Sequence, residues 1–459
     1  MTFLSARPLS DLSIGMEAQI TRLCVTDDLY VFANASGNLN PMHIPHVDGD
    51  RDGEAEAVAP SMWLGALISA VIGNQLPGPG TLYVRQNFRF LDRVQAGQSV
   101  TATVRISQIG DATATLDTWV ERADGVRLLE GEAEVIPPAT AGSFEMADVP
   151  GLTLRRHQHF DALLEKAAPL PDIPCAVIAP DEPSALAGAL LGAEHTLIRP
   201  ILVGDRDKIL ETAQAIGRSL DGIEIEHMPD HGAAAARGVA LVHEGRVQAL
   251  MKGHLHTDQL LRHVVKRDGG LRTGRRLSHV FVMDVPGLTN LLLISDAAIN
   301  ISPDLQAKAD ITQNAIDLAR SIGIETPRVG ILSAVETVNP SIPSTLDAAA
   351  LSKMADRGQI TGGVVDGPLA MDNAIDMSAA RTKGIKSLVA GQADILIAPN
   401  LEAGNLMAKE LTFLAHAEAA GLVIGAQVPI ILSSRADDEA SRLASCAVAA
   451  LYAQRAKSP

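Results

Sequence analysis

The chain has 459 residues, of which 47% are hydrophobic and 20% charged, and its formal net charge is -16. This length predicts two or three domains, the composition is ordinary for a globular enzyme, and the acidic balance argues against a nucleic-acid partner. The absence of a long uncharged apolar run and of a signal-peptide core predicts a cytoplasmic protein without a membrane segment.

The first 137 residues read as one α+β domain. Residues 60–72 are a long apolar segment with a helical pattern. Residues 100–106 alternate between apolar and polar, as in a half-buried strand, and residues 112–135 read as two strands around the Asp124–Gly125 turn. A buried helix followed by an antiparallel sheet is typical of this class.

The motif ASGNLNPMHIPH, residues 35–46, resembles the MaoC-like, or type 2, enoyl-CoA hydratase motif on a hot-dog fold. The resemblance spans nearly all of residues 10–136 and implies that a carboxylate and a histidine add water to an enoyl thioester. His43 is present, but Asn38 stands where the family has aspartate, and Pro60 and Ser61 replace the usual His-Gly pair. An amide cannot accept a proton, although it can position a water, so catalysis and a structural role for His43 both stay open.

Residues 138–158 carry Pro, Gly and Ser without a long period, which predicts a linker. From Phe160 onward, apolar runs alternate with helical patterns, which predicts parallel strands covered by helices on both faces. The predicted strands are residues 175–180, 200–205, 249–253, 279–284, 291–296, 329–334, 395–400 and 429–434. One predicted helix spans residues 403–420.

Residues 248–300 contain the largest concentration of candidate ligand-binding side chains. Their two apolar runs each stop at a polar cluster, and ligands of open α/β sheets bind at the carboxyl ends of strands. Cationic side chains lie between the runs, at Arg262, Lys266, Arg267, Arg272, Arg275 and Arg276. The arginine fork matches phosphate, so this stretch predicts a site for phosphate-bearing ligands. A solvated basic loop is the alternative.

The same stretch resembles the phosphate acetyl/butyryltransferases, through LMKGHLHTDQLLR, GLRTGRRLSHVFVMDVPG and LLISDAAINISPD. The resemblance continues to PIILSSRAD, covers most of residues 160–459 and is closer to the butyryl branch. It implies two α/β lobes with the site between them, one formed by residues 159–276 plus 425–459 and the other by residues 277–424. We therefore expect a multidomain protein, with an α+β hot-dog domain (1–137), a linker (138–158) and a two-lobed α/β phosphate acyltransferase with parallel sheets (159–459).

The segment SSRADDEASRL, residues 433–443, ends a predicted strand and begins a helix, where serine, arginine and free backbone N–H groups can bind an anion. The resemblance implies that Ser434 steadies the reacting carbonyl or phosphate, that Arg435 holds the acyl phosphate, and that Arg262 binds a phosphate of substrate or CoA. It also implies substrate contacts at Lys252, Gly253, His256, Thr257, Arg272, Arg275, Arg276, Asp296, Asn300, Asp366, Gly404 and Asn405. The base for the CoA thiol stays open, because Ser441 stands where the acetyl branch has aspartate.

The resemblance predicts a phosphate acyltransferase that exchanges an acyl group between CoA and inorganic phosphate. Its partners would be small molecules, with CoA as substrate and product, no tightly bound cofactor and no metal. The three cysteines, Cys24, Cys175 and Cys446, lie far apart without metal-ligand spacing. We expect a homo-oligomer of at least two chains, because hot-dog domains generally pair through their sheets. A true bifunctional hydratase and acyltransferase, and a non-catalytic acyl-CoA-binding scaffold, are the alternatives.

Overall fold

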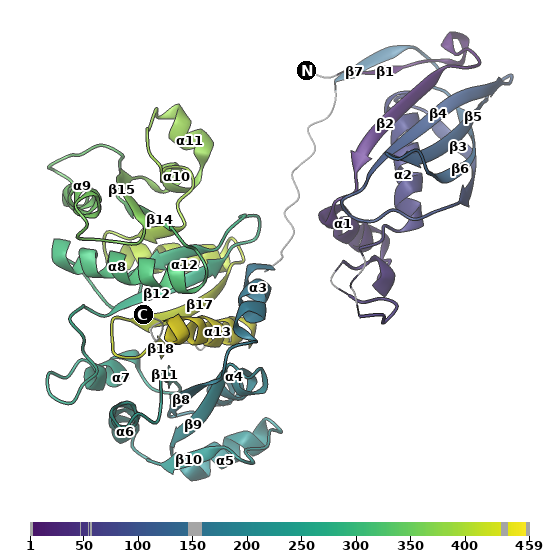
Figure 1. Cartoon of the computed structure of the whole chain (residues 1–459). Coiled ribbons are helices and arrows are strands. Elements are labelled where there is room, and N and C mark those ends of the chain that lie inside the picture. Colours follow the sequence, from purple (N-terminus) through teal and green to yellow (C-terminus); the bar gives the residue numbers. More distant parts are fainter. Residues whose placement is uncertain are drawn as a thin grey trace. The chain divides into compact units, whose positions relative to one another are not determined.

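The computed structural model describes residues 3–45, 47–53, 55, 57–145, 158–432 and 439–455. The chain divides into two compact units, Met1–Leu154 and Arg155–Pro459 (Figure 1). Among the described residues, no helix combines the length and apolar character needed to span a membrane.

The first unit is an antiparallel sheet that packs against one central helix. The strand order is β2 (Glu17–Leu23), β4 (Ser99–Ile109), β5 (Ala114–Arg122), β6 (Arg127–Ile136) and β3 (Leu82–Phe90). Helix α2 (Ser61–Asn74) is apolar over most of its length, and Leu64, Ile68 and Ile72 pack into the same buried cluster as the inward-facing residues of β4 and β5. This arrangement confirms the predicted α+β hot-dog domain.

Smaller elements complete this unit. They are η1 (Leu9–Asp11), α1 (Thr26–Ser36), η2 (Pro41–His43), and the two-stranded ribbon of β1 (Phe3–Ala6) and β7 (Gly142–Glu145). Strand β7 lies inside the segment that the sequence predicts to be a linker. Its pairing with the start of the chain explains why local composition did not reveal it.

The second unit is built on one eleven-stranded sheet with three parts. At one end, β10 (Glu224–His227), β9 (Ile198–Gly204), β8 (Ile173–Ile178), β11 (Ala249–Lys252) and β18 (Ile430–Ile431) are parallel. At the other end, β13 (Leu292–Ser295), β16 (Ile395–Ile397), β14 (Arg328–Leu332) and β15 (Val364–Leu369) are parallel to each other. Between them, β17 (Glu418–Ile424) and β12 (Ser278–Asp284) are antiparallel to each other and to both neighbours.

The sheet is therefore mixed, and the prediction of purely parallel pairing is wrong at its centre. The reason is the length of two connections: residues 285–291 join β12 to β13, and residues 425–429 join β17 to β18. Connections this short close hairpins, whereas a parallel crossover needs a dozen or more residues. As a result, the strands of the two parallel groups run in opposite directions.

Helices cover both faces of this sheet. The helices before β14 are α3 (Gln158–Ala167), α4 (Pro183–Glu194), α5 (Arg206–Ala215), α6 (His231–His243), α7 (Thr257–Val264) and α8 (Leu305–Ser321). Those after β14 are α9 (Pro343–Asp356), α10 (Met371–Ile375), α11 (Met377–Thr382), α12 (Leu401–Phe413) and α13 (Glu439–Arg455). The predicted helix 403–420 ends early, because residues 418–424 form the central strand β17.

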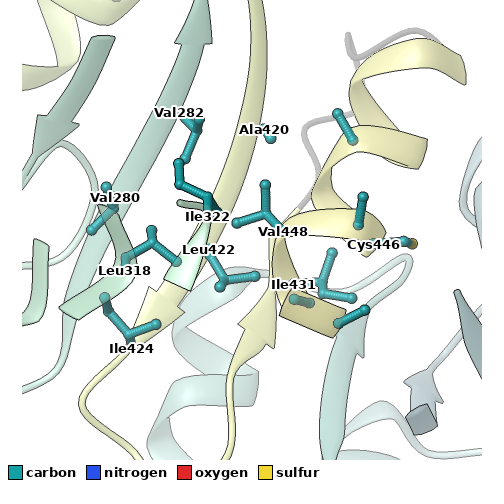
Figure 2. Packing of buried hydrophobic residues seen from close by; sticks show 14 of the residues in the cluster. Val280, Val282, Leu318, Ile322, Ala420, Leu422, Ile424, Ile431, Cys446 and Val448 are labelled. Atoms are coloured by element: carbon teal, nitrogen blue, oxygen red, sulfur yellow. The ribbon is translucent and has the colours of Figure 1, made fainter. Parts of the chain in front are cut away.

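The largest buried cluster lies where α8 and α13 pack against β12, β17 and β18 (Figure 2). Leu422 of β17 and Val448 of α13 are fully buried there, as are Leu318 of α8 and Ile431 of β18. A second cluster fills the space between α6, α7 and the strands β8, β11 and β18. The second cluster includes Leu255, which follows β11, and Leu271 and Leu277, which precede β12, so it holds both loops in place.

Candidate functional site

The loop after β13 is held by the side chain of Asp296. This buried carboxylate accepts hydrogen bonds from the backbone N–H groups of Ala298, Ile299 and Asn300, at 2.8, 3.0 and 3.2 Å, and from the Asn300 amide. The Asn300 amide also donates to the Leu277 carbonyl at 2.9 Å. Asp296 therefore shapes the loop and joins it to the start of β12.

Helix α12 packs against the same loop. Gly404 is so close to it that an added Cβ would come well within 3.0 Å of the Asp296 carbonyl oxygen. The neighbouring Asn405 donates its side-chain N–H to the Ala297 carbonyl at 3.1 Å. Four residues predicted as substrate contacts thus lie together, Asp296 and Asn300 in the loop and Gly404 and Asn405 in α12. Their observed contacts join α12 to this loop.

A pocket of about 110 Å³ opens beside this loop, at the start of α8. It is lined by Arg276, Asn300, Ile301, Ser302, Pro303, Asp304 and Ala307. Asp304 caps the helix by accepting from the Ala307 N–H at 2.8 Å. Among the described residues, Arg276 has no carboxylate partner for its guanidinium. The pocket therefore combines a free cation with a volume suited to one small group.

The three arginines of the GLRTGRR segment differ in their contacts. Arg275 forms an ion pair with Asp317 of α8. Arg272 pairs through its backbone with Ala426, and its exposed side chain has no ion-pair partner in the described part of the chain. Thr273 donates its hydroxyl to the Gly425 carbonyl at 2.6 Å, which ties the segment to the β17–β18 turn. Arg272 and Arg276 are thus available for a ligand, while Arg275 serves the fold.

Other predicted residues lie on β11, α7 and the turn between them. Lys252 donates to the carbonyls of Gly253 and Leu255 at 3.2 and 3.3 Å, and a Cβ at Gly253 would collide with the backbone of β8. His256 precedes α7, and its N–H donates to the Gln259 side chain at 3.2 Å. Thr257 is the first residue of α7. Gly253 is therefore required by strand packing, whether or not a ligand approaches it.

The end of α7 is cationic. Arg262 is 73% exposed and lies 3.6 Å from the equally exposed Asp258, a pair that contributes little to stability. Burial, followed by Lys266 and Arg262, lowers the pKa of His263. A positive potential at this helix end favours an anionic ligand over a cationic one.

The two polar clusters of residues 248–300 do not share a sheet edge. Strand β11 is parallel to β18, β18 is antiparallel to β17, and two further antiparallel pairings lead to β13. Strands β11 and β13 therefore run in opposite directions, and Lys252 and Asp296 follow them at opposite ends. Asp366 lies farther away, in β15, and accepts from the Gly367 N–H at 2.8 Å. Ser434 and Arg435 lie outside the described residues.

In the first unit, His43 and Asn38 lie near the end of α1. The Nδ1 atom of His43 is 2.9 Å from the Val58 carbonyl, to which it donates, so the neutral ring has its lone pair on Nε2. Asn38 accepts through its side-chain oxygen from the Asn40 N–H at 3.3 Å. The Val58 carbonyl thus fixes the orientation of the His43 ring, as proton transfer requires. The Asn38 amide holds the turn that precedes His43 in the chain.

Two further groups of side chains were not predicted from the sequence. Asp181 contacts both His231 and His254 near the ends of β8 and β11. Their separation along the chain gave no local motif, although Asp181 and His254 each follow a predicted strand. In the first unit, Asp48, Asp50 and Asp52 gather their carboxylates within 4.8 Å of one another. The Asp48 carboxylate accepts from the N–H groups of its own loop.

The fold and these sites define an α/β protein with phosphate-compatible arginines, preceded by a hot-dog domain. Comparison with family models matches residues 230–450 to the phosphate acetyl/butaryl transferase family and residues 11–122 to the MaoC-like domain. The chain is 63% identical over 276 residues to a phosphate acetyltransferase of Rhizobium meliloti, covering 60% of this chain and 87% of that protein. It is 44% identical over 301 residues to a phosphate butyryltransferase of Clostridium beijerinckii, covering 65% and 99%.

Among solved structures, a branched-chain phosphotransacylase from Enterococcus faecalis matches with a TM-score of 0.54 and 28% identity, over 61% of this chain and 99% of that one. The chain belongs to the phosphate acetyl/butyryltransferase family, and it carries a MaoC-like domain at its N-terminal side. Both family resemblances inferred from the sequence are confirmed. The expected closer likeness to the butyryl branch is not supported, because the identity is 63% to the Rhizobium meliloti acetyltransferase and 44% to the Clostridium beijerinckii butyryltransferase.

Proposed function

We propose that the second unit exchanges an acyl group between CoA and inorganic phosphate. The observation that carries this proposal is the 63% identity to a phosphate acetyltransferase over nearly the whole length of that relative. The guanidinium groups of Arg272 and Arg276, which form no ion pair with any residue that the structure describes, support it, because they suit the phosphates of CoA or the inorganic substrate. The acyl chain length is open, since relatives named for acetyl and butyryl transfer both match.

In one direction, a phosphate oxygen attacks the thioester carbonyl, the carbon–sulfur bond breaks and CoA leaves. In the other, the CoA sulfur attacks the acyl phosphate and phosphate leaves. Arginines neutralise the phosphoryl charge and hold both substrates, so proximity and charge stabilisation supply most of the rate. We assign the reacting centre to Ser434 and Arg435, and phosphate binding to Arg262, Arg272 and Arg276. CoA is a substrate and a product, and the exchange requires no further cofactor.

The test is thiol release from acetyl-, propionyl- and butyryl-CoA, with and without phosphate. Wild type is compared with Arg435→Ala, Arg276→Ala and the matched control Arg275→Ala, whose side chain is engaged with Asp317. We expect phosphate-dependent release that Arg435→Ala abolishes and that Arg276→Ala weakens at low CoA ester concentration, with a smaller effect of Arg275→Ala. Absence of release from all three esters would refute the acyltransferase and favour a CoA-binding scaffold.

We propose a second, subordinate role for the first unit in binding acyl- or enoyl-CoA. The orientation of His43 by the Val58 carbonyl favours proton transfer, whereas Asn38 supplies no base. Hydration of crotonyl-CoA by the full chain should therefore be very slow in wild type and rise in Asn38→Asp. Ordinary turnover in wild type that His43→Ala abolishes would show instead that the protein is a true bifunctional enzyme.

We also propose that the chain assembles at least as a dimer in the cytoplasm. Strand β3 is an edge of the first unit's sheet, and it exposes Leu82, Tyr83 and Val84 to 64%, 41% and 52%. Unpaired edges with apolar side chains favour association with another strand. Light scattering on wild type and Val84→Lys tests this, and a monomeric wild type would refute it.

A further inference from the structure

A buried carboxylate joins two histidines at one edge of the second unit's sheet. The side chain of Asp181 is only 6% exposed. Its Oδ1 lies 3.2 Å from Nδ1 of His254, and its Oδ2 lies 3.0 Å from Nε2 of His231. The two rings are 6.0 Å apart and remain partly accessible, at 41% for His254 and 31% for His231. The cluster is thus anchored on its inner side and open on its outer side.

The position of this cluster is set by three neighbouring parallel strands. Asp181 follows β8, and His254 follows β11, with its N–H bonded to the Ala179 carbonyl at 2.7 Å. Strand β11 has β8 on one side and β18 on the other, all three parallel. Their carboxyl ends therefore meet at one edge, which is where α/β sheets bind and transform their ligands.

The two histidines contact Asp181 through different ring nitrogens. Because a carboxylate only accepts, Asp181 fixes the proton of neutral His254 on Nδ1 and leaves the outward Nε2 with a lone pair. This is the arrangement by which an aspartate orients a general base. His231 uses Nε2 for Asp181, so its remaining Nδ1 lies on the side of its own backbone, in the first turn of α6. His254 therefore keeps Nε2, the ring nitrogen farther from its own backbone, for a ligand.

We propose that His254, oriented by Asp181, is the proton acceptor and donor for the CoA sulfur. The inference rests on the proposed acyl exchange and adds the group whose identity the sequence leaves open. When CoA attacks an acyl phosphate, the S–H proton moves to Nε2 of His254, the sulfur–carbon bond forms, and phosphate departs with the electron pair of the broken carbon–oxygen bond. In the reverse direction, the imidazolium returns that proton to the departing thiolate.

An imidazole suits this task at neutral pH. A free thiol ionises near pH 8.5, so at pH 7 only a small fraction is thiolate, and a positioned base that takes the thiol proton gains about 10²-fold or more. Two titratable groups neighbour the ring, Asp181 after β8 and His231 of α6, and Lys252 of β11 and His256 before α7 are close to His254 in the sequence. Asp181 is the one in direct contact through Nδ1.

The experiment measures kcat/KM for CoA in acyl-CoA formation from acetyl phosphate and butyryl phosphate, between pH 6 and 9.5, on the full chain. The variants are His254→Ala, His254→Gln, Asp181→Asn and His231→Ala. We expect His254→Ala and His254→Gln to lose about 10²-fold at pH 7, with the loss shrinking as the pH passes the thiol pKa near 8.5. Asp181→Asn should show a smaller loss of the same pH-dependent form, and His231→Ala should stay within about threefold of wild type.

The outcomes separate this inference from the proposed function. If wild type forms acyl-CoA and both His254 variants match it at pH 7, the proton-transfer role is refuted while the acyltransferase stands. A loss that is equal at every pH also refutes it, because a structural role does not depend on thiol ionisation. If wild type forms no acyl-CoA from either substrate, the proposed function fails and the inference fails with it.

Discussion

Replacing Gly404 by alanine tests how strictly the loop after β13 is positioned. The added Cβ would come within 3.0 Å of the Asp296 carbonyl oxygen and also contact Ala398 and Ala297. The loop has little freedom to move away, because Asp296 and Asn300 hold it to β12 through the Leu277 carbonyl. Overpacking of a closely packed site costs about 1–3 kcal/mol. Alanine in place of a helical glycine returns up to about 1 kcal/mol.

We therefore expect Gly404→Ala to lower the free energy of unfolding by about 1–2 kcal/mol and to weaken phosphate-dependent thiol release. Urea unfolding, with the midpoint and the m-value fitted separately, measures the first effect. Gly73→Ala is the control, because Gly73 also lies in a helix, a Cβ there meets nothing within 4 Å and its φ is not positive. A Gly404→Ala protein as stable and active as that control would refute the claim that α12 fixes this loop.

Three further predictions concern buried charge and buried thiols. Arg328→Ala leaves the 6% exposed Asp394 without its cationic partner, and it should lower the free energy of unfolding in urea by about 3–5 kcal/mol. Lys353→Ala removes one member of an exposed ion pair and should lower it by less than about 1 kcal/mol. Burial, partly opposed by Asp296, lowers the pKa of His279 to about 4. Between pH 6.5 and 4 the unfolded chain therefore binds more protons than the folded chain, so the free energy of unfolding should fall as the pH drops through that window. His279→Phe should reduce this fall in the free energy of unfolding. Burial raises the pKa of Cys446 to about 12, and all three cysteines are buried. Ellman's reagent should therefore titrate no thiol of the native protein and three thiols after unfolding. Rapid reaction of a thiol in the native protein would contradict this.

Local patterns predicted elements whose own residues show a clear period or turn signal. The helix expected over residues 60–72 is α2, and the hairpin around Asp124–Gly125 is β5 and β6. Strand β17 was missed because its alanines follow helix α12 without a turn signal and it is buried at the centre of the sheet. A fully buried strand shows no alternation, so periodicity cannot separate it from a helix.

The candidate site was predictable where residues follow strands and hidden where distant segments meet. Strand ends pointed to Lys252, Asp296 and Asn300, but the pairing of Asp181 with His254 joins residues 73 positions apart. Sequence could not distinguish the guanidinium of Arg275, which Asp317 engages, from those of its neighbours. That distinction depends on where α8 packs, which no local pattern records.

The reversal of strand direction at the centre of the sheet bears on how one substrate could use both groups of residues. Because β11 and β13 run oppositely, the histidine edge and the Arg276 pocket follow different ends of the strands. CoA is a long molecule whose phosphates lie far from its thiol, so a substrate of this shape requires separated sites for charge and for chemistry. Cations on the segment 272–276 suit its phosphate end, whereas an oriented base suits its sulfur. The separation of charge and chemistry that the proposed reaction requires is thus compatible with a mixed sheet, in which the two groups of residues lie at opposite strand ends.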